Sequence, residues 1–598
     1  MNPRVIAAAA LLTLSVGPAF AAADRLDRQL AVEMERGLID DRDAAVYRLL
    51  AFTRPELLPL PLRGLALDDL ADIDEGERAG CGTTRILDVL RRHGDLDTVH
   101  HELVRAALGW PLADPAYHAS GAGGDALPPP PEAAESCNAS APNEQESDNF
   151  VVKWGPNYNG GGVDDLLAVM EDSRTVFVEQ LGYQQPHGVG TGWKLPVFIG
   201  NSGGGMPTIG WSGGYTTLCT DHQGAYIVLS QDIESWEFTA DVAPHELFHA
   251  VQFGYGGAMM IEGYWWEATA VWSEDQAYPD VNGYIWFLTE YTSGPHQALN
   301  MENGVHEYAM FIFPMAIEEF VDDGIDALRT LWEAPGSGQI PDALGGILGE
   351  SHGTTFDDAF AVFTARAAVM EDFEDGALFS KPSRIASTGD YPAGGDDEAD
   401  YPPQTYGSNF IELDAPDAEP PDTKLRFEFD GAGESSWLLG ALRHRVGDGT
   451  NKAVVGNVGG DGTAVMEFID FGTLYDEVVV GVTWTGGGAA PPYSWSADIV
   501  EQTEPQGDDD DGDDDDSADP LPTGCLTSPS PYHFSVDDAH AANACRLSGA
   551  AQRPPLAGVL FPFGLMILLV ARRTWRGQAT RSSSQLSSRC QAGSQRVS

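Results

Sequence analysis

Cysteine and basic side chains are both scarce in this chain of 598 residues. It has six cysteines and no C-x-x-C pair, which excludes a disulfide-rich scaffold and leaves no signature of a structural zinc knuckle. Lysine and arginine together number 33 against 91 acidic residues, so the formal net charge is −58. Because the phosphates of nucleic acid would repel such a surface, this balance excludes nucleic acid as a partner.

The chain does have enough apolar residues for globular domains, and it begins with an export signal. Hydrophobic residues make up 42% of the sequence, which suits two or three domains joined by linkers. Arg4 precedes an apolar run over residues 5–16, and Ala19-Phe20-Ala21 follows as a small-residue cleavage site. We interpret residues 1–23 as a secretory signal peptide and expect an exported protein.

The C-terminal end predicts an anchor or a sorting tag. Residues 502–524 include the run GDDDDGDDDDSADP, which is too charged to bury apolar surface and is typical of an extended spacer. Residues 556–571 are uncharged and apolar, as expected of a transmembrane segment. The tail over residues 572–598 holds six arginines and no acidic residue, so it should stay in the cytoplasm. We expect a cell-envelope protein, either anchored there or released extracellularly after sorting machinery processes the tail.

Composition divides the rest of the chain into four parts. Residues 24–120 space their apolar side chains three and four apart, as helices do, and form either an integral region or a removable pro-segment that blocks a site. The segment 121–147 is rich in Ala, Gly and Pro and predicts a linker. Residues 148–385 mix short strands with helices. Residues 400–501 contain alternating strands about ten residues apart, which predicts a β-sandwich.

Export permits disulfide bridges, although spacing alone does not determine how the cysteines pair. Cys81 could pair with Cys137, and Cys525 with Cys545. Cys219 would then be free and buried.

The centre of the chain carries a metal-binding motif, H-E-L-F-H. In an α-helix His245 and His249 lie on one face, where both imidazoles can reach a single Zn²⁺. Glu246 would lie close to the metal without binding it, as a general base must. The motif is short enough to occur by chance, so its surroundings decide its meaning.

Those surroundings predict a strand followed by two helices. Residues 225–229 are expected to be an edge strand that holds an extended peptide by backbone pairing. Thr239 or Asp241 is expected to cap the motif helix, and Gly254 to end it. A second helix is expected from about residue 263 to 276.

A catalytic zinc site needs a third protein ligand and one open position for water. No H-x-x-G-x-x-H continuation follows His249, so the ligand must come from elsewhere. Glu267 is the preferred candidate, because one loop and one helical turn can return its carboxylate to the metal. Glu274 and Glu262 are the alternatives, and Glu274 could instead orient a ligating histidine.

The pair H-E-L-F-H and W-W-E-A-T-A-V-W resembles the glutamate zincins, and more narrowly the uncharacterised predicted metallopeptidases of secreted bacterial proteins. The resemblance implies an α+β zincin-like metallopeptidase domain, with a helical N-terminal region and a C-terminal β-sandwich domain. It implies His245, His249 and Glu267 as zinc ligands and Glu246 as the base. The implied activity is that of a zinc metalloendopeptidase acting on protein or peptide substrates.

Such an enzyme also needs a donor for the oxyanion formed from the scissile carbonyl. Tyr308 is the preferred candidate and His306 the alternative, although either could simply be a packing residue. Two other functions stay open from the sequence. One is a non-catalytic adhesion or substrate-capture protein on a zincin-like fold, and the other is a zinc hydrolase acting on a cell-wall amide. The sequence does not predict the oligomeric state.

Overall fold

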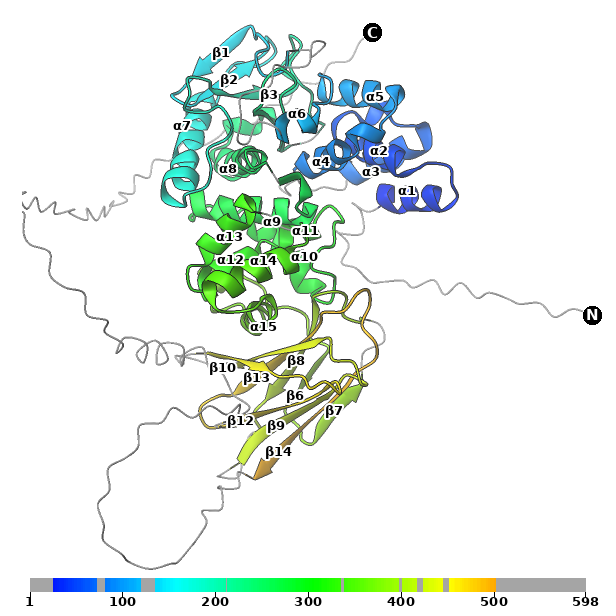
Figure 1. Ribbon diagram of the computed structural model, residues 1–598, viewed down its shortest axis with the longest axis vertical. Helices are drawn as coiled ribbons and strands as arrows, with labels where there is room; N and C mark the ends of the chain where they lie inside the picture. The colour runs from blue at the N-terminus through cyan, green and yellow to red at the C-terminus, as the bar shows by residue number, and fades with distance from the viewer. Residues whose placement is uncertain are drawn as a thin grey trace, which may run out of the picture. The chain divides into compact units, whose positions relative to one another are not determined.

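The computed structural model describes residues 25–71, 81–119, 135–210, 212–256, 258–334, 338–396, 401–416, 423–444, 451–469 and 471–501. The predicted signal peptide, acidic spacer, apolar segment and basic tail lie outside these ranges, as does the Cys525–Cys545 pair. Within them the protein is a mixed α/β structure with several β-sheets (Figure 1). No helix in the described part is both long enough and apolar enough to cross a membrane.

Six helices make up the N-terminal part, where the sequence shows helical periodicity. Two of them begin at capping boxes, in which Asp40 and Asp97 accept hydrogen bonds from backbone N–H groups of the first turn. Their apolar faces form a shared core. The helices are α1 Arg25–Glu35, α2 Asp41–Thr53, α3 Leu60–Ala71, α4 Thr83–Arg91, α5 Thr98–Leu108 and α6 Pro115–Ala119.

A five-stranded sheet with the order β1-β2-β3-β5-β4 follows. Its central pairs β2–β3 and β3–β5 are parallel, whereas β1–β2 and β4–β5 are antiparallel. The predicted strand 225–229 is β5, but it lies inside the sheet, so the prediction of an edge strand was wrong. A short loop returns the chain from β4 to β5, which leaves β4 at the edge. The strands are β1 Asn143–Glu146, β2 Phe150–Trp154, β3 Leu195–Ile199, β4 Gly214–Leu218 and β5 Ala225–Leu229.

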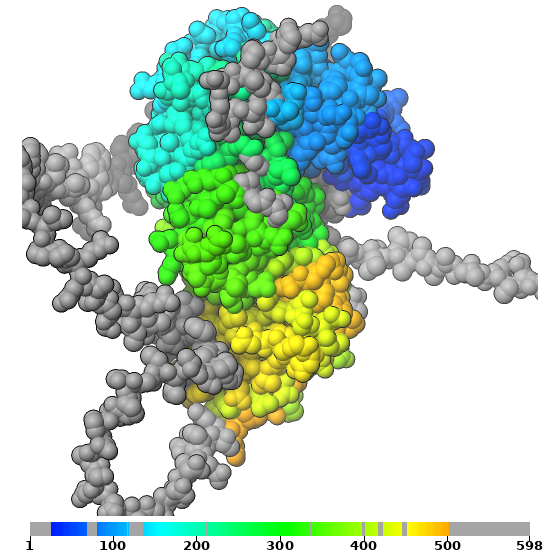
Figure 2. All heavy atoms as spheres, viewed as in Figure 1, coloured from blue at the N-terminus to red at the C-terminus, as the bar shows by residue number. Residues whose placement is uncertain are grey.

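Both faces of this sheet are covered, as expected where central strands are buried on both sides. Side chains alternate between the faces along each strand. Ile227 and Leu229 join the core of α7 (Val163–Arg174) and α8 (Trp236–Phe253). Tyr226 and Val228 join the core of the N-terminal helices, whose blue surface adjoins the green surface of the following segment (Figure 2). The N-terminal helices are therefore packed into the fold, and removing them would expose one face of the sheet.

Helices dominate the next part of the chain. α9 confirms the helix predicted from residue 263, and it packs directly against α8 (Figure 1). Trp265, Trp266 and Trp272 on α9 are fully buried and anchor the surrounding core. The helices are α9 Gly263–Ala277, α10 Ile285–Ser293, α11 His306–Ala309, α12 Ile312–Phe320, α13 Gly324–Glu333, α14 Ile340–Ile347 and α15 Phe356–Ala367.

Residues 135–147 differ from the predicted linker 121–147. They contain β1, and Cys137 forms a disulfide with Cys219. The pairing of Cys81 with Cys137 suggested by the sequence was therefore wrong, as was the expectation that Cys219 is free, and among the described residues Cys81 is the free, buried cysteine. Asp221 accepts hydrogen bonds from the backbone N–H groups of Cys137 and Asn138, which holds this segment against the sheet.

The C-terminal part contains two sheets, with orders β11-β10-β13-β8-β6 and β12-β9-β14-β7. Their inward side chains form one shared core. Two of the strands, β6 and β7, precede the predicted boundary at residue 400. The strands are β6 Ala386–Thr388, β7 Ala393–Asp396, β8 Gly407–Asp414, β9 Thr423–Asp430, β10 Trp437–His444, β11 Lys452–Gly456, β12 Thr463–Ile469, β13 Glu477–Trp484 and β14 Ser494–Glu501.

Candidate metal centre

The motif helix α8 is longer than the sequence suggested. It begins at Trp236 and is capped by Ser235, whose hydroxyl accepts a hydrogen bond from Phe238 N–H, so neither Thr239 nor Asp241 is the cap. Gly254 follows its last residue, as predicted. The helix is buried from Thr239 to Gln252, because the sheet lies on one side and α9 on the other.

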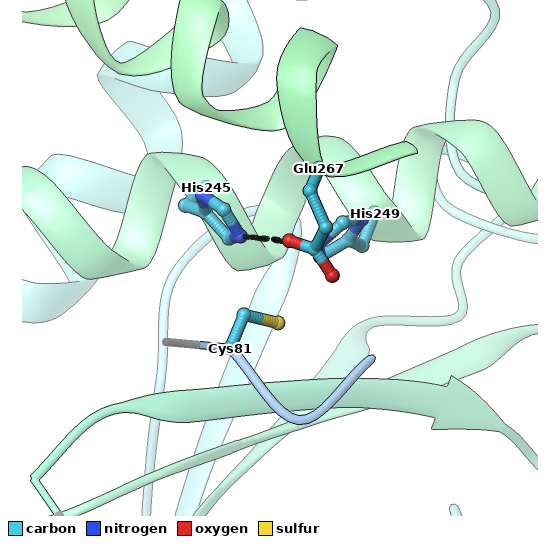
Figure 3. Close-up of side chains that lie close together, drawn as sticks. All are labelled: Cys81, His245, His249 and Glu267. Atoms are coloured by element: carbon cyan, nitrogen blue, oxygen red, sulfur yellow. Dashed lines mark hydrogen bonds and ion pairs between the residues drawn. The ribbon is translucent and has the colours of Figure 1, made fainter. Parts of the chain in front are cut away.

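His245, His249 and Glu267 lie together between α8 and α9 (Figure 3). The two histidine Nε2 atoms are 3.1 Å apart. Glu267 Oε2 lies 3.2 Å from Nε2 of His245 and 3.4 Å from Nε2 of His249. All three side chains are almost completely buried. The structure thus brings together the three residues that the sequence singled out as ligands.

A fourth donor, which the sequence reasoning missed, completes the group. Cys81 comes from the segment just before α4, and its side chain points toward the other three (Figure 3). One ligand atom from each of the four residues lies within 4.8 Å of every other. Apart from its being one of few cysteines, no local pattern marks Cys81. Only the fold brings it to the motif helix.

Hydrogen bonds on the far side of each imidazole orient the two histidines. His245 Nδ1 lies 2.7 Å from Glu274 Oε1, and His249 Nδ1 lies 2.7 Å from Gln252 Oε1. The Gln252 amide nitrogen donates to Trp266 O, so its oxygen must be the acceptor toward His249. His249 therefore carries its proton on Nδ1 and presents a lone pair at Nε2, as a metal ligand does.

The group fits a metal ion better than it fits a simple ion pair. Two ring nitrogens and a carboxylate oxygen converge within hydrogen-bond distance, in a place with little solvent. Without a metal, a proton must hold these atoms together. Burial alone would lower the pKa of His245. Hydrogen bonds to Glu267 and Glu274 outweigh burial and raise this pKa to about 9. Burial opposes ionisation of Glu267, but the two histidines lower its pKa well below the usual value. Zinc can take the place of that proton, because imidazole, carboxylate and thiolate are its usual ligands.

Glu246 lies beside this group and is fully buried. Its Oε2 accepts a hydrogen bond from the Thr216 hydroxyl at 2.8 Å and one from the Thr83 hydroxyl at 3.3 Å. Among the described residues, Oε1 has no hydrogen-bond partner. A Cβ on Gly214 would come within 2.8 Å of Oε1, so the glycine on β4 leaves room for this carboxylate.

The other candidate residues lie outside the donor group. Glu262 accepts hydrogen bonds from Asn300 and from Ile340 N–H, so its carboxylate holds the loop before α11 and the first residue of α14. Glu274 contacts His245 but is not one of the four donors. Tyr308 stacks near His245, and its hydroxyl donates to Cys81 O at 3.0 Å. His306 is buried on α11 and is absent from the group.

We expect Glu274→Gln to weaken zinc binding about 10–100-fold, because the neutral amide no longer raises the basicity of His245. One zinc per chain should still bind at saturation, since the four donors are retained. Competition with a chelating dye measures the affinity. Glu262→Gln is the matched control, a glutamate near the same helix outside the group, and it should leave the affinity unchanged. Equal affinities of Glu274→Gln and the parent protein would contradict the role of Glu274.

A second set of carboxyl groups lies at the other end of α9. The Tyr284 hydroxyl contacts both Asp275 and Asp375, although it has only one proton to donate. Burial, reinforced by the charge of Asp375, raises the pKa of Asp275 to about 7. The folded state therefore keeps a proton on Asp275 that the unfolded state loses near the ordinary value of 3.8. Stability must then fall as pH rises from about 4 to about 7 and stay lower above that.

We expect Asp275→Asn to stabilise the protein by about 2 kcal/mol at pH 8 and by little at pH 4, because asparagine has no proton to lose. Urea unfolding at the two pH values measures the difference. Asp280→Asn removes an exposed carboxylate nearby and should change stability at neither pH. A gain for Asp275→Asn that is the same at both pH values would show that its effect does not come from ionisation.

Fold and site together define a mixed α/β protein with a buried candidate metal centre between two helices. The model of DUF6055, a family of unknown function, matches residues 130–444. This match covers just over half of the 598 residues, so the chain belongs to the DUF6055 family. The matched range contains His245, His249, Glu267 and Glu246, whereas Cys81 precedes it. No curated protein matches the chain.

Proposed function

We propose that this protein is an exported zinc-dependent peptidase that hydrolyses peptide bonds. The main support for this proposal is the environment of the Glu246 carboxylate. Its carboxylate is fully buried beside three residues suited to binding zinc, and one of its oxygens has no partner among the described residues. Burying a carboxyl oxygen without a hydrogen-bond partner is costly, and structural stability alone gives no reason for it. A general base needs such a free oxygen.

Zinc bound by His245, His249 and Glu267 would supply Lewis acidity and lower the pKa of a coordinated water molecule toward neutrality. Glu246 Oε1 would accept the proton and later return it to the leaving amine. Thr216 holds the other carboxylate oxygen and so fixes the direction of Oε1. Glu274 and Gln252 keep the two imidazoles in the protonation state in which Nε2 binds metal.

The edge strand β4 is the place for an extended substrate. It lies against the motif helix α8, and only β5 pairs with it in the described sheet. Two backbone groups on its open side already bind another part of the chain, because Gly82 N–H donates to Gly214 O and Thr216 N–H donates to the Thr83 hydroxyl. A peptide bound along β4 would use such groups in the same way.

We also propose a zincin-like domain, a C-terminal β-sandwich domain and export from the cytoplasm. A sheet whose edge strand β4 lies beside a H-E-x-x-H helix, and a second helix that supplies Glu267, support a zincin-like domain. Two sheets with one core support a C-terminal β-sandwich domain. The sequences of residues 1–23 and 556–571 support export and either envelope anchoring or release after processing.

A non-catalytic capture protein on the same fold is the second candidate, and one observation favours it. Four protein donors, including Cys81, would complete a tetrahedral site, and closed sites of this kind usually stabilise structure. The unpartnered oxygen of Glu246 favours catalysis instead, since a closed structural site has no use for a further buried carboxyl group.

The test uses the full chain and its Cys81→Ser variant, each loaded with zinc and incubated with denatured casein. The variant is included because a fourth protein ligand would keep water from the metal. Cleavage by either protein that stops when a chelator removes the zinc, and returns with added zinc, would support a peptidase. One zinc per chain in both proteins without any cleavage would contradict the proposal and favour the capture protein.

A further inference from the structure

The segment Cys81–Thr84 lies in the candidate site as a bound ligand would. Its last two residues begin α4, and the four together contact both helices of the site and the edge strand. The Thr83 hydroxyl reaches Glu246 Oε2, and Thr84 donates to Glu267 Oε1 from its hydroxyl at 2.8 Å and from its N–H at 3.2 Å. Gly82 N–H pairs with Gly214 O on β4 at 3.0 Å.

The sulfur of Cys81 lies close to the donor atoms of His245, His249 and Glu267. It is one of the four mutually close ligand atoms, and Thr83 N–H donates to it at 3.1 Å. The Cys81 backbone is held as well, because the Tyr308 hydroxyl donates to its carbonyl. Close packing around Gly82 adds to this, since a Cβ there would meet the Phe52 ring at 2.6 Å. The sulfur thus lies in a fixed place beside the three predicted ligands and Glu246.

We propose that Cys81 is the fourth ligand of a zinc ion held by His245, His249 and Glu267, and that Cys81–Thr84 is a built-in inhibitor of the site. This inference rests on the proposed peptidase function. The segment blocks catalysis in two ways. Cys81 takes the position that water needs, and Gly82 and Thr83 take the groups of β4 that would bind a peptide backbone.

The same geometry explains why Tyr308 cannot serve the reaction in this arrangement. Its hydroxyl proton is directed to Cys81 O and is not free to stabilise an oxyanion. If the segment withdraws, that hydroxyl becomes free at a place close to His245. Tyr308 would therefore change from a residue that positions the inhibitor segment to the oxyanion donor predicted from the sequence.

The N-terminal helices share a core with the sheet, so inhibition is best tested by point substitution in the full chain rather than by deletion. Zinc K-edge X-ray absorption of the zinc-loaded full chain identifies the ligand atoms and their distances from zinc. We expect one sulfur at about 2.3 Å, with the other ligands at about 2.0–2.1 Å. Cys81→Ser should keep zinc, lose the sulfur signal and cleave casein at least tenfold faster than the parent chain. Its fold is checked by circular dichroism.

The outcomes separate this inference from the function on which it rests. Zinc without a sulfur ligand, in a parent chain that cleaves casein, would overturn the inference and leave the peptidase standing. A sulfur signal with equal, measurable cleavage by parent and variant would overturn the inhibitory role alone. Absence of zinc from both proteins would contradict the peptidase function itself. The X-ray absorption spectrum of the parent chain shows whether zinc has a sulfur ligand even if Cys81→Ser fails to fold.

Discussion

Glu246→Gln should lower the rate of casein cleavage about 10²–10⁴-fold while zinc remains bound, as expected for loss of a general base. Glutamine has the size of glutamate and can still accept the Thr216 hydrogen bond, so the packing of α8 should not change. The amide cannot take up a proton at neutral pH. The measurement is kcat/KM in the Cys81→Ser background, with zinc content determined on the same samples.

The matched control is Glu237→Gln, which changes an exposed glutamate on the first turn of the same helix. It should leave both rate and zinc content unchanged. If Glu246→Gln cleaves casein as fast as its parent, Glu246 is not the base, and the unpartnered oxygen has another explanation. If zinc is lost together with activity, the carboxylate supports the metal rather than the proton transfer.

Glu267→Gln should remove zinc from the full chain. The substitution takes away the negative oxygen that lies close to both histidine Nε2 atoms, yet it preserves side-chain size and an acceptor for Thr84. A ligand present at 1,000 times its Kd stabilises the folded state by about 4 kcal/mol, and this contribution should vanish. Elemental analysis gives the zinc content, and thermal unfolding with and without a chelator gives the stabilisation.

Glu318→Gln is the control for this variant, since Glu318 is a partly buried carboxylate that accepts hydrogen bonds from Trp272 and Gln276 on the same helix α9. It should keep one zinc per chain and its sensitivity to the chelator. Retention of zinc by Glu267→Gln would mean that Glu267 is not a ligand, and the third donor would have to be sought at Glu274.

Local patterns in the sequence predicted much of the fold. Apolar spacing placed the helix from residue 263 close to its observed bounds, and alternation over residues 400–501 correctly indicated strands there, β8, β9 and β10 among them. The patterns did not predict sheet order. β5 reads as an edge strand by length and composition, but its neighbours depend on where the β4–β5 loop returns the chain. β4 itself was missed, because a five-residue strand that begins with glycine and carries two adjacent threonines has little periodicity.

For the site, proximity in sequence decided what could be predicted. His245, Glu246 and His249 share one helix, and Glu267 follows on the next, so helical geometry sufficed to bring them together. Cys81 reaches them only through long-range packing, and Thr83 is 163 residues away from Glu246 in the chain. No spacing rule connects such positions, which is why the sequence suggested a bridge from Cys81 to Cys137 instead.

We propose above all that a metal ion is bound by His245, His249, Glu267 and Cys81. Anomalous diffraction at the zinc edge from crystals of the full chain grown with zinc tests it most directly. We expect one strong peak per chain, bounded by the two Nε2 atoms, the Glu267 carboxylate and the Cys81 sulfur. A density map without that peak, with His245 bonded directly to Glu267 and Glu274, would contradict the account and identify the cluster as a buried ion pair.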